Sequence, residues 1–156
     1  MKFQFGFLAM TVVLVACGAP GPASSTSGGP DSGGPELACL LPSNCVTSRG
    51  SGGMEPLRYT GTPAQALDRL RATVATFQEA AVVRAEPLAL ELIFTTPAGF
   101  RDQVDFRIDA QAQRIDFRSR SLFGLFDFGK NRARMQEFAT RFEQQSRPAA
   151  RFPAKA

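Results

Sequence analysis

Four consecutive segments in the middle of the chain alternate between apolar and polar residues, which is the two-residue period of a half-buried β-strand. The predicted strands span approximately residues 80–85, 88–95, 102–109 and 113–120. Short breaks rich in turn-forming residues separate them, at 86–87, 96–99 and 110–113. Because each connection is short, we expect neighbouring strands to pair antiparallel in a four-strand meander.

The last two predicted strands contain enough information to fix their register. A four-residue loop at 110–113 sets Phe106 opposite Phe117 and Ile108 opposite Ile115 on the core face. Complementary charges then pair on the outer face: Asp105 with Arg118, Arg107 with Asp116, and Asp109 with Arg114. A slip by one residue would set apolar against charged side chains, so the pattern strongly favours this register.

Apolar residues at spacings of three and four predict a first helix over residues 63–77. Thr62 can cap this helix, Pro63 suits its first turn, and Gln65 completes a capping box. Its predicted buried face consists of Leu67, Leu70, Val74 and Phe77.

A second helix is predicted over residues 130–145 by the same spacing. Its buried stripe consists of Met135, Phe138 and Phe142. Glu137 and Arg141 form a potential ion pair one turn apart on the outside, and Asp127 is a candidate cap. With a short strand at 56–60, the order is strand, helix, four-strand antiparallel meander, helix. We therefore predict one two-layer α+β domain over residues 39–145.

The N-terminus resembles the signal peptide of an exported lipoprotein. Residues 1–16 have a short basic start and an apolar stretch too short for a comfortable membrane span. They end in the lipobox-like sequence LVAC, whose Cys17 would receive the lipid anchor. An ordinary signal peptide with a chance cysteine and an uncleaved anchor are the alternatives. Residues 17–38, rich in Gly, Pro and Ser, predict a flexible tether, and 146–156 a disordered basic tail.

Two further cysteines, Cys39 and Cys45, follow the tether closely. Outside the cytoplasm, neighbouring cysteines most often form a structural disulfide, which is the favoured interpretation. A redox pair or a metal clip is the alternative.

Composition restricts the possible chemistry. Histidine is absent, which excludes Ser-His-Asp and Cys-His nucleophiles and removes the commonest metal ligand. We therefore expect neither a cofactor nor a metal site. Residues 118–156 contain nine basic and three acidic side chains, against eight and eleven in 18–117. This basic bias favours an anionic lipid or envelope polymer as partner, and export argues against nucleic acid.

Three stretches resemble, in order, the pattern of family 1499 among the domains of unknown function. They are CLLPSNCVTS at 39–48, PLRY at 56–59 and RSRSLFGLFDFGKNRAR at 118–134. The resemblance covers about residues 39–144 and implies a shared fold, but no reaction. Leu122 stands where the family pattern has Arg, Pro42 is displaced by one position, and Thr47 replaces Ser. The missing charge at 122 counts against any anion site that required it.

The segment 118–134 concentrates the candidate binding residues between the last strand and the second helix. They are Arg118, Ser121, Asp127, Asn131, Arg132 and Arg134. Serine hydroxyls, arginine forks and helix-start N–H groups could converge on one anion. The structural alternative pairs Arg118 with Asp105 and uses Asp127 as a cap; it is favoured for Arg118 and evenly balanced for the others.

The same segment contains five large apolar residues: Leu122, Phe123, Leu125, Phe126 and Phe128. They could enter a bilayer beside the anchor, but we expect them instead to cover the sheet's open face.

The leading hypothesis is a non-catalytic lipoprotein of the bacterial cell envelope, held on the non-cytoplasmic side of a membrane, that binds an anionic or lipidic ligand or an envelope partner. A hydrolase or transferase using Ser119 or Ser121 with Lys130 is one alternative, and a structural spacer or assembly factor is another.

Overall fold

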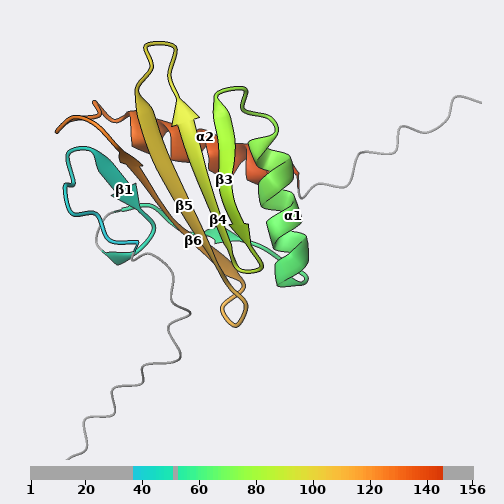
Figure 1. Ribbon diagram of the computed structural model, residues 1–156. Coiled ribbons are helices and arrows are strands. Elements are labelled where there is room, and N and C mark those ends of the chain that lie inside the picture. The colour runs from blue at the N-terminus through green and yellow to red at the C-terminus, as the bar shows by residue number, and fades with distance from the viewer. Residues whose placement is uncertain (1–36, 51–52, 146–156) are drawn as a thin grey trace, which may run out of the picture. The chain divides into compact units, whose positions relative to one another are not determined.

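The computed structural model describes residues 37–50 and 53–145. The predicted signal peptide at 1–16, Cys17, the tether up to residue 36 and the tail at 146–156 lie outside the described residues. The described part is an antiparallel sheet with two helices, α1 and α2, on one of its faces (Figure 1). This confirms the predicted two-layer α+β fold.

Four strands form the predicted meander. They are β3 (Ala80–Glu86), β4 (Ala89–Thr95), β5 (Arg101–Asp109) and β6 (Arg114–Ser121). The sheet order is β1-β6-β5-β4-β3, in which β1 (Cys45–Thr47) is a short strand, and β2 (Leu57–Arg58) pairs with β6 beside this path. The β5–β6 register is the predicted one, with Phe106 opposite Phe117 and Asp105 opposite Arg118.

Helix α1 (Pro63–Val74) begins as the sequence predicts. The Thr62 hydroxyl accepts a hydrogen bond from the Gln65 N–H, and the Gln65 side chain accepts one from the Thr62 N–H. The helix ends at Val74 rather than at residue 77, because the chain turns there and the Phe77 N–H donates to the Val74 carbonyl. Phe77 still packs into the core.

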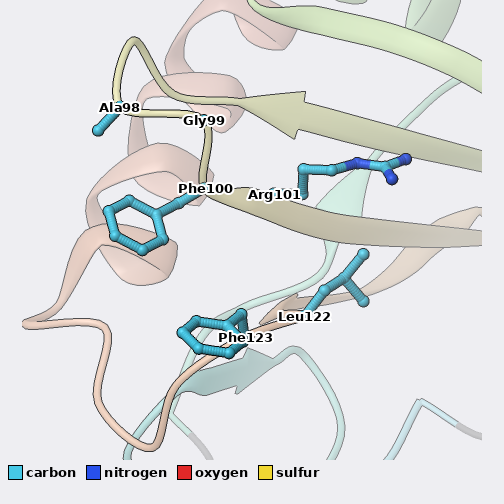
Figure 2. A pocket seen from close by; sticks show the side chains of 6 residues that line it. All are labelled: Ala98, Gly99, Phe100, Arg101, Leu122 and Phe123. Carbon is cyan, nitrogen blue, oxygen red and sulfur yellow. The ribbon is translucent and has the colours of Figure 1, made fainter.

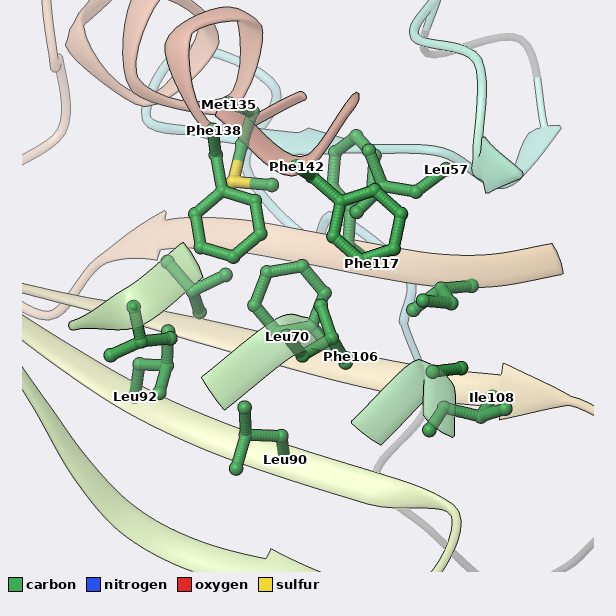
Figure 3. Close-up of a cluster of buried hydrophobic side chains, with 14 of the residues drawn as sticks. Leu57, Leu70, Leu90, Leu92, Phe106, Ile108, Phe117, Met135, Phe138 and Phe142 are labelled. Atoms are coloured by element: carbon green, nitrogen blue, oxygen red, sulfur yellow. The ribbon is translucent and has the colours of Figure 1, made fainter. Parts of the chain in front are cut away.

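Helix α2 (Lys130–Gln144) lies against the sheet through Met135, Phe138 and Phe142, all buried as predicted. These residues meet the apolar face of the central strands in a cluster that Figure 3 shows in part. The Phe138 ring lies 4.9 Å from that of Phe106 and 5.6 Å from that of Phe77, centroid to centroid. Aromatic packing therefore joins α2, the sheet and the end of α1.

Three further features differ from the prediction. A short strand, β1 (Cys45–Thr47), pairs with β6 and was not predicted, because three residues are too few to show an alternating pattern. Leu37, which the sequence assigned to the tether, is buried, and its carbonyl accepts a hydrogen bond from the Thr47 hydroxyl.

The third difference concerns the outer face of the sheet. Two of the predicted acidic residues there are buried: Asp105 and Asp116 are only 1% and 2% exposed. The Ala38 carbonyl accepts a hydrogen bond from Arg118, the partner of Asp105. Asp116 forms ion pairs with Arg49 and Arg114 rather than with Arg107, which faces it in the sheet. The Asp105–Arg118 pair is therefore an internal contact, whereas the Asp109–Arg114 pair lies at the surface.

Candidate functional site

Asn131, in the first turn of α2, is fully buried at the centre of a hydrogen-bond network. Its side-chain carbonyl accepts from the Ser119 hydroxyl at 2.6 Å and from the Arg134 guanidinium at 3.0 Å. Its amide group donates to the Asn44 carbonyl at 3.0 Å and to the Ser121 hydroxyl at 3.2 Å. All four hydrogen-bonding positions of the amide are thus used within the protein.

The arginines of the segment also have internal partners. Arg134 forms an ion pair with buried Asp102 at 2.6 Å, and Arg118 one with Asp105 at 2.7 Å, as predicted. Arg132 lies exposed and donates to the Gly53 carbonyl. Direct ligand binding by these residues stays a prediction. Arg134 holds the start of α2 against β5, and Asn131 holds it against β6 and against Asn44, the residue before β1.

Asp127 receives the hydrogen bonds expected of a helix cap, although Gly129 occupies the cap position itself. Its carboxylate accepts from the N–H groups of Gly129 and Asn131, both at 2.9 Å. Burial raises the pKa of the Asp127 carboxyl, but these hydrogen bonds outweigh burial and bring the pKa below its ordinary value. The carboxylate is therefore ionised and engaged with the backbone, not available as a general acid.

A nucleophilic serine is not supported by this geometry. The Ser119 hydroxyl is fully buried and donates to Asn131, so a substrate cannot reach it. The Ser121 hydroxyl accepts from Asn131, and Lys130 is exposed, with no side-chain contact to either serine. Asn131, which donates to the Ser121 hydroxyl, is also fully buried.

Cys39 and Cys45 form the predicted disulfide, with their Cα atoms 5.6 Å apart. In residues 37–50 and 53–145, no group of His, Cys, Asp and Glu side chains is arranged to hold a metal ion. The disulfide closes a small loop that packs against the loop after β6. The Ser43 hydroxyl donates to the Leu125 carbonyl, Asn44 donates to the Gly124 carbonyl, and the Asp127 N–H donates to the Ser43 carbonyl.

These two loops and the β4–β5 turn present a group of exposed apolar side chains, here called the apolar end. Its members, with exposed fractions from 45% to 94%, are Leu40, Leu41, Phe100, Leu122, Phe123, Leu125, Phe126 and Phe128. Phe128 is 94% exposed and Leu40 is 88% exposed. The expectation that residues 122–128 cover the sheet is therefore wrong.

The reason lies in how the loop is held. The helix face of the sheet is already filled by α1 and α2, while hydrogen bonds to the disulfide loop hold the backbone of 124–127 beyond the last strand. Gly124 and Phe128 have positive φ angles of 92° and 53°, which mark sharp turns in this path. For a phenylalanine such a conformation is uncommon.

A cleft of about 360 Å³ lies within the apolar end, between the β4–β5 turn and the loop after β6 (Figure 2). Ala98, Gly99, Phe100 and Arg101 line one side, and Leu122 and Phe123 line the other. In this view the rings of Phe100 and Phe123 both lie toward the left, while the side chains of Arg101 and Leu122 extend to the right. The sequence named Leu122 and Phe123 only as residues that would cover the sheet or enter a bilayer, and Phe100 and Arg101 were missed, because a strand-end residue gives no periodic signal of its own.

No helix in the described residues is long and apolar enough to cross a bilayer. Residues 37–142 match a family model described as "Protein of unknown function (DUF1499)", which confirms the resemblance seen in the sequence motifs. No curated protein and no solved structure matches the chain. Because the match covers more than half of the chain, the protein belongs to this family.

Proposed function

We propose that this DUF1499 protein is a non-catalytic lipoprotein of the bacterial cell envelope whose domain contacts the membrane through its apolar end. The observation that carries the proposal is the exposure of eight large apolar side chains at one end of the fold. A monomeric soluble domain rarely exposes more than about 300–600 Å² of contiguous apolar surface. The four phenylalanines alone expose roughly 600 Å², at about 200 Å² for each side chain.

Charge at the apolar end supports a membrane rather than an apolar protein surface. Arg101 directly follows Phe100 in the chain, Lys130 follows Phe128 by two residues, and both basic side chains are exposed. The acidic residues of the same segments already have partners, because Asp102 pairs with Arg134 and Asp127 accepts helix N–H groups. Apolar side chains next to exposed basic ones suit the boundary between acyl chains and anionic headgroups.

The path of the chain supports the same orientation. Leu37 enters the described domain two residues before Cys39, whose disulfide loop contributes Leu40 and Leu41 to the apolar end. A lipid on Cys17 would be connected to this loop by a segment of about twenty residues, with a root-mean-square length of roughly 25 Å. The anchor would therefore hold the apolar end near the bilayer.

Flotation with lipid vesicles tests the proposal. A chain of residues 18–156 keeps every core residue, and a cooperative thermal transition would verify that it is folded. The variant Phe126→Ser/Phe128→Ser removes about 300 Å² of exposed apolar surface. Burying half of that surface in a bilayer would contribute up to about 4 kcal/mol to the free energy of membrane binding. We expect the wild type to float with vesicles and this variant to lose at least about tenfold in partitioning.

Val82→Ser/Val83→Ser is the matched control, because these two valines are 46% and 51% exposed on β3, away from the apolar end. It should float like the wild type. A folded wild type that does not float, or equal loss in both variants, would overturn membrane contact. A dimer in sedimentation that only the phenylalanine variant dissociates would instead assign the surface to a second copy.

Mass spectrometry of the full chain from bacterial membranes tests the anchor separately: a mature protein without a diacylglyceryl mass on Cys17 would refute it.

A further inference from the structure

The cleft in the apolar end combines apolar walls with one cation that the fold does not use. In the described part of the chain, the Arg101 guanidinium makes no hydrogen bond or ion pair. Arg118 and Arg134, by contrast, are each held by a buried aspartate. Asp102, the residue after Arg101, is only 4% exposed and forms its ion pair with Arg134 rather than with Arg101.

From these contacts, and resting on the proposed membrane contact, we infer that this cleft binds one anionic lipid, with its phosphate on Arg101 and its acyl chain along Phe100, Leu122 and Phe123. A guanidinium binds phosphate through two parallel hydrogen bonds, and the rings supply the apolar surface that an acyl chain requires. The volume of about 360 Å³ is at the small end for ligand pockets, which fits the upper part of one chain rather than a whole lipid.

The backbone around the cleft favours the arginine as the phosphate ligand. The turn that contributes Gly99 and Phe100 is closed on itself: the Gly99 N–H donates to the Thr96 carbonyl, and the Phe100 N–H donates to the Thr96 hydroxyl. The Leu122 N–H donates to the Arg101 carbonyl, which ties the two walls together. These three N–H groups are engaged, so the charged side chain is the group left to select the headgroup.

The test compares Arg101→Gln with Lys130→Gln in the chain of residues 18–156. Both residues are exposed cations beside the apolar end, but only Arg101 lines the cleft. Vesicles contain either phosphatidylcholine alone or phosphatidylcholine with phosphatidylglycerol. We expect the wild type to prefer the anionic vesicles. Arg101→Gln should reduce that preference by about tenfold, because it removes a charge-assisted hydrogen-bonded contact to the phosphate. Lys130→Gln should have a much smaller effect.

A second measurement separates a lipid from a free anion. Monomeric dodecyl phosphate should saturate one site in a calorimetric titration, Arg101→Gln should weaken it about tenfold, and inorganic phosphate should not displace it. Equal binding to both kinds of vesicle would overturn the lipid site while leaving membrane contact intact. Equal losses in the two variants would reduce the effect to general charge attraction and also refute the site. Saturable amphiphile binding without any flotation would support the site and refute the proposed membrane contact.

Discussion

Replacing Asn131 by alanine tests whether the residues of segment 118–134 hold the fold together. The change deletes four hydrogen bonds and removes the acceptor of the buried Ser119 hydroxyl, while the Asn44 carbonyl keeps its hydrogen bond from the Ser121 N–H. At about 1 kcal/mol for each bond, the loss is roughly 4 kcal/mol, which better helix propensity offsets by about half a kcal/mol. We therefore expect the free energy of unfolding to fall by about 3 kcal/mol.

Urea unfolding followed by far-ultraviolet circular dichroism measures this change. A loss of about 3 kcal/mol corresponds to a melting temperature lower by roughly 15 °C for a domain of this size. Gln136→Ala is the matched control, because Gln136 is exposed on the same helix and should change stability by less than about 0.5 kcal/mol.

A double-mutant cycle measures how much the hydrogen bond between Ser119 and Asn131 contributes to this loss of stability. Ser119 and Asn131 share a 2.6 Å hydrogen bond, so the cost of Ser119→Ala/Asn131→Ala should be smaller than the sum of the single costs by about 1 kcal/mol. Additive effects, or an Asn131→Ala variant within about 1 kcal/mol of the wild type, would refute the structural role. The side chain would then be free for a ligand, as the sequence alone allowed.

Two other perturbations have expected outcomes. Cys39→Ser/Cys45→Ser should lower the free energy of unfolding by about 2 kcal/mol, the loop-closure value for so short a loop, and a urea midpoint unchanged from the oxidised wild type would contradict this. Asp127→Asn should cost stability at neutral pH but progressively less below the ordinary carboxyl pKa of 3.8. The reason is that the pKa of Asp127 is lower in the folded protein than in the unfolded chain. The ionised carboxylate therefore stabilises the fold at pH values above the unfolded-state pKa, and this stabilisation is lost as the pH falls through the folded-state pKa. Unfolding curves for both proteins between pH 7 and about pH 3 would check this, and a constant difference across that range would count against it.

The sequence by itself determined the two helices, the four strands of the meander and the pairing of the last two strands. The capping box at Thr62 and Gln65 acts through residues three apart, so local sequence suffices to place the start of α1. The β5–β6 register follows because every facing pair is complementary, and a one-residue slip exchanges the two faces of the strand. The stripe of Met135 and Phe138 likewise identified the buried side of α2.

Only the tertiary structure decided which side chains are hidden and which are presented. Asn131 and Asp105 are polar and would ordinarily be exposed, yet they are buried with hydrogen-bond partners that include residues 12, 13 and 87 positions away in sequence. Phe126 and Phe128 are apolar and would ordinarily be buried, yet the loop that contains them is held outside the sheet by the disulfide loop. Burial depends on what the rest of the chain places above a residue, and periodicity reports only the direction in which a side chain points.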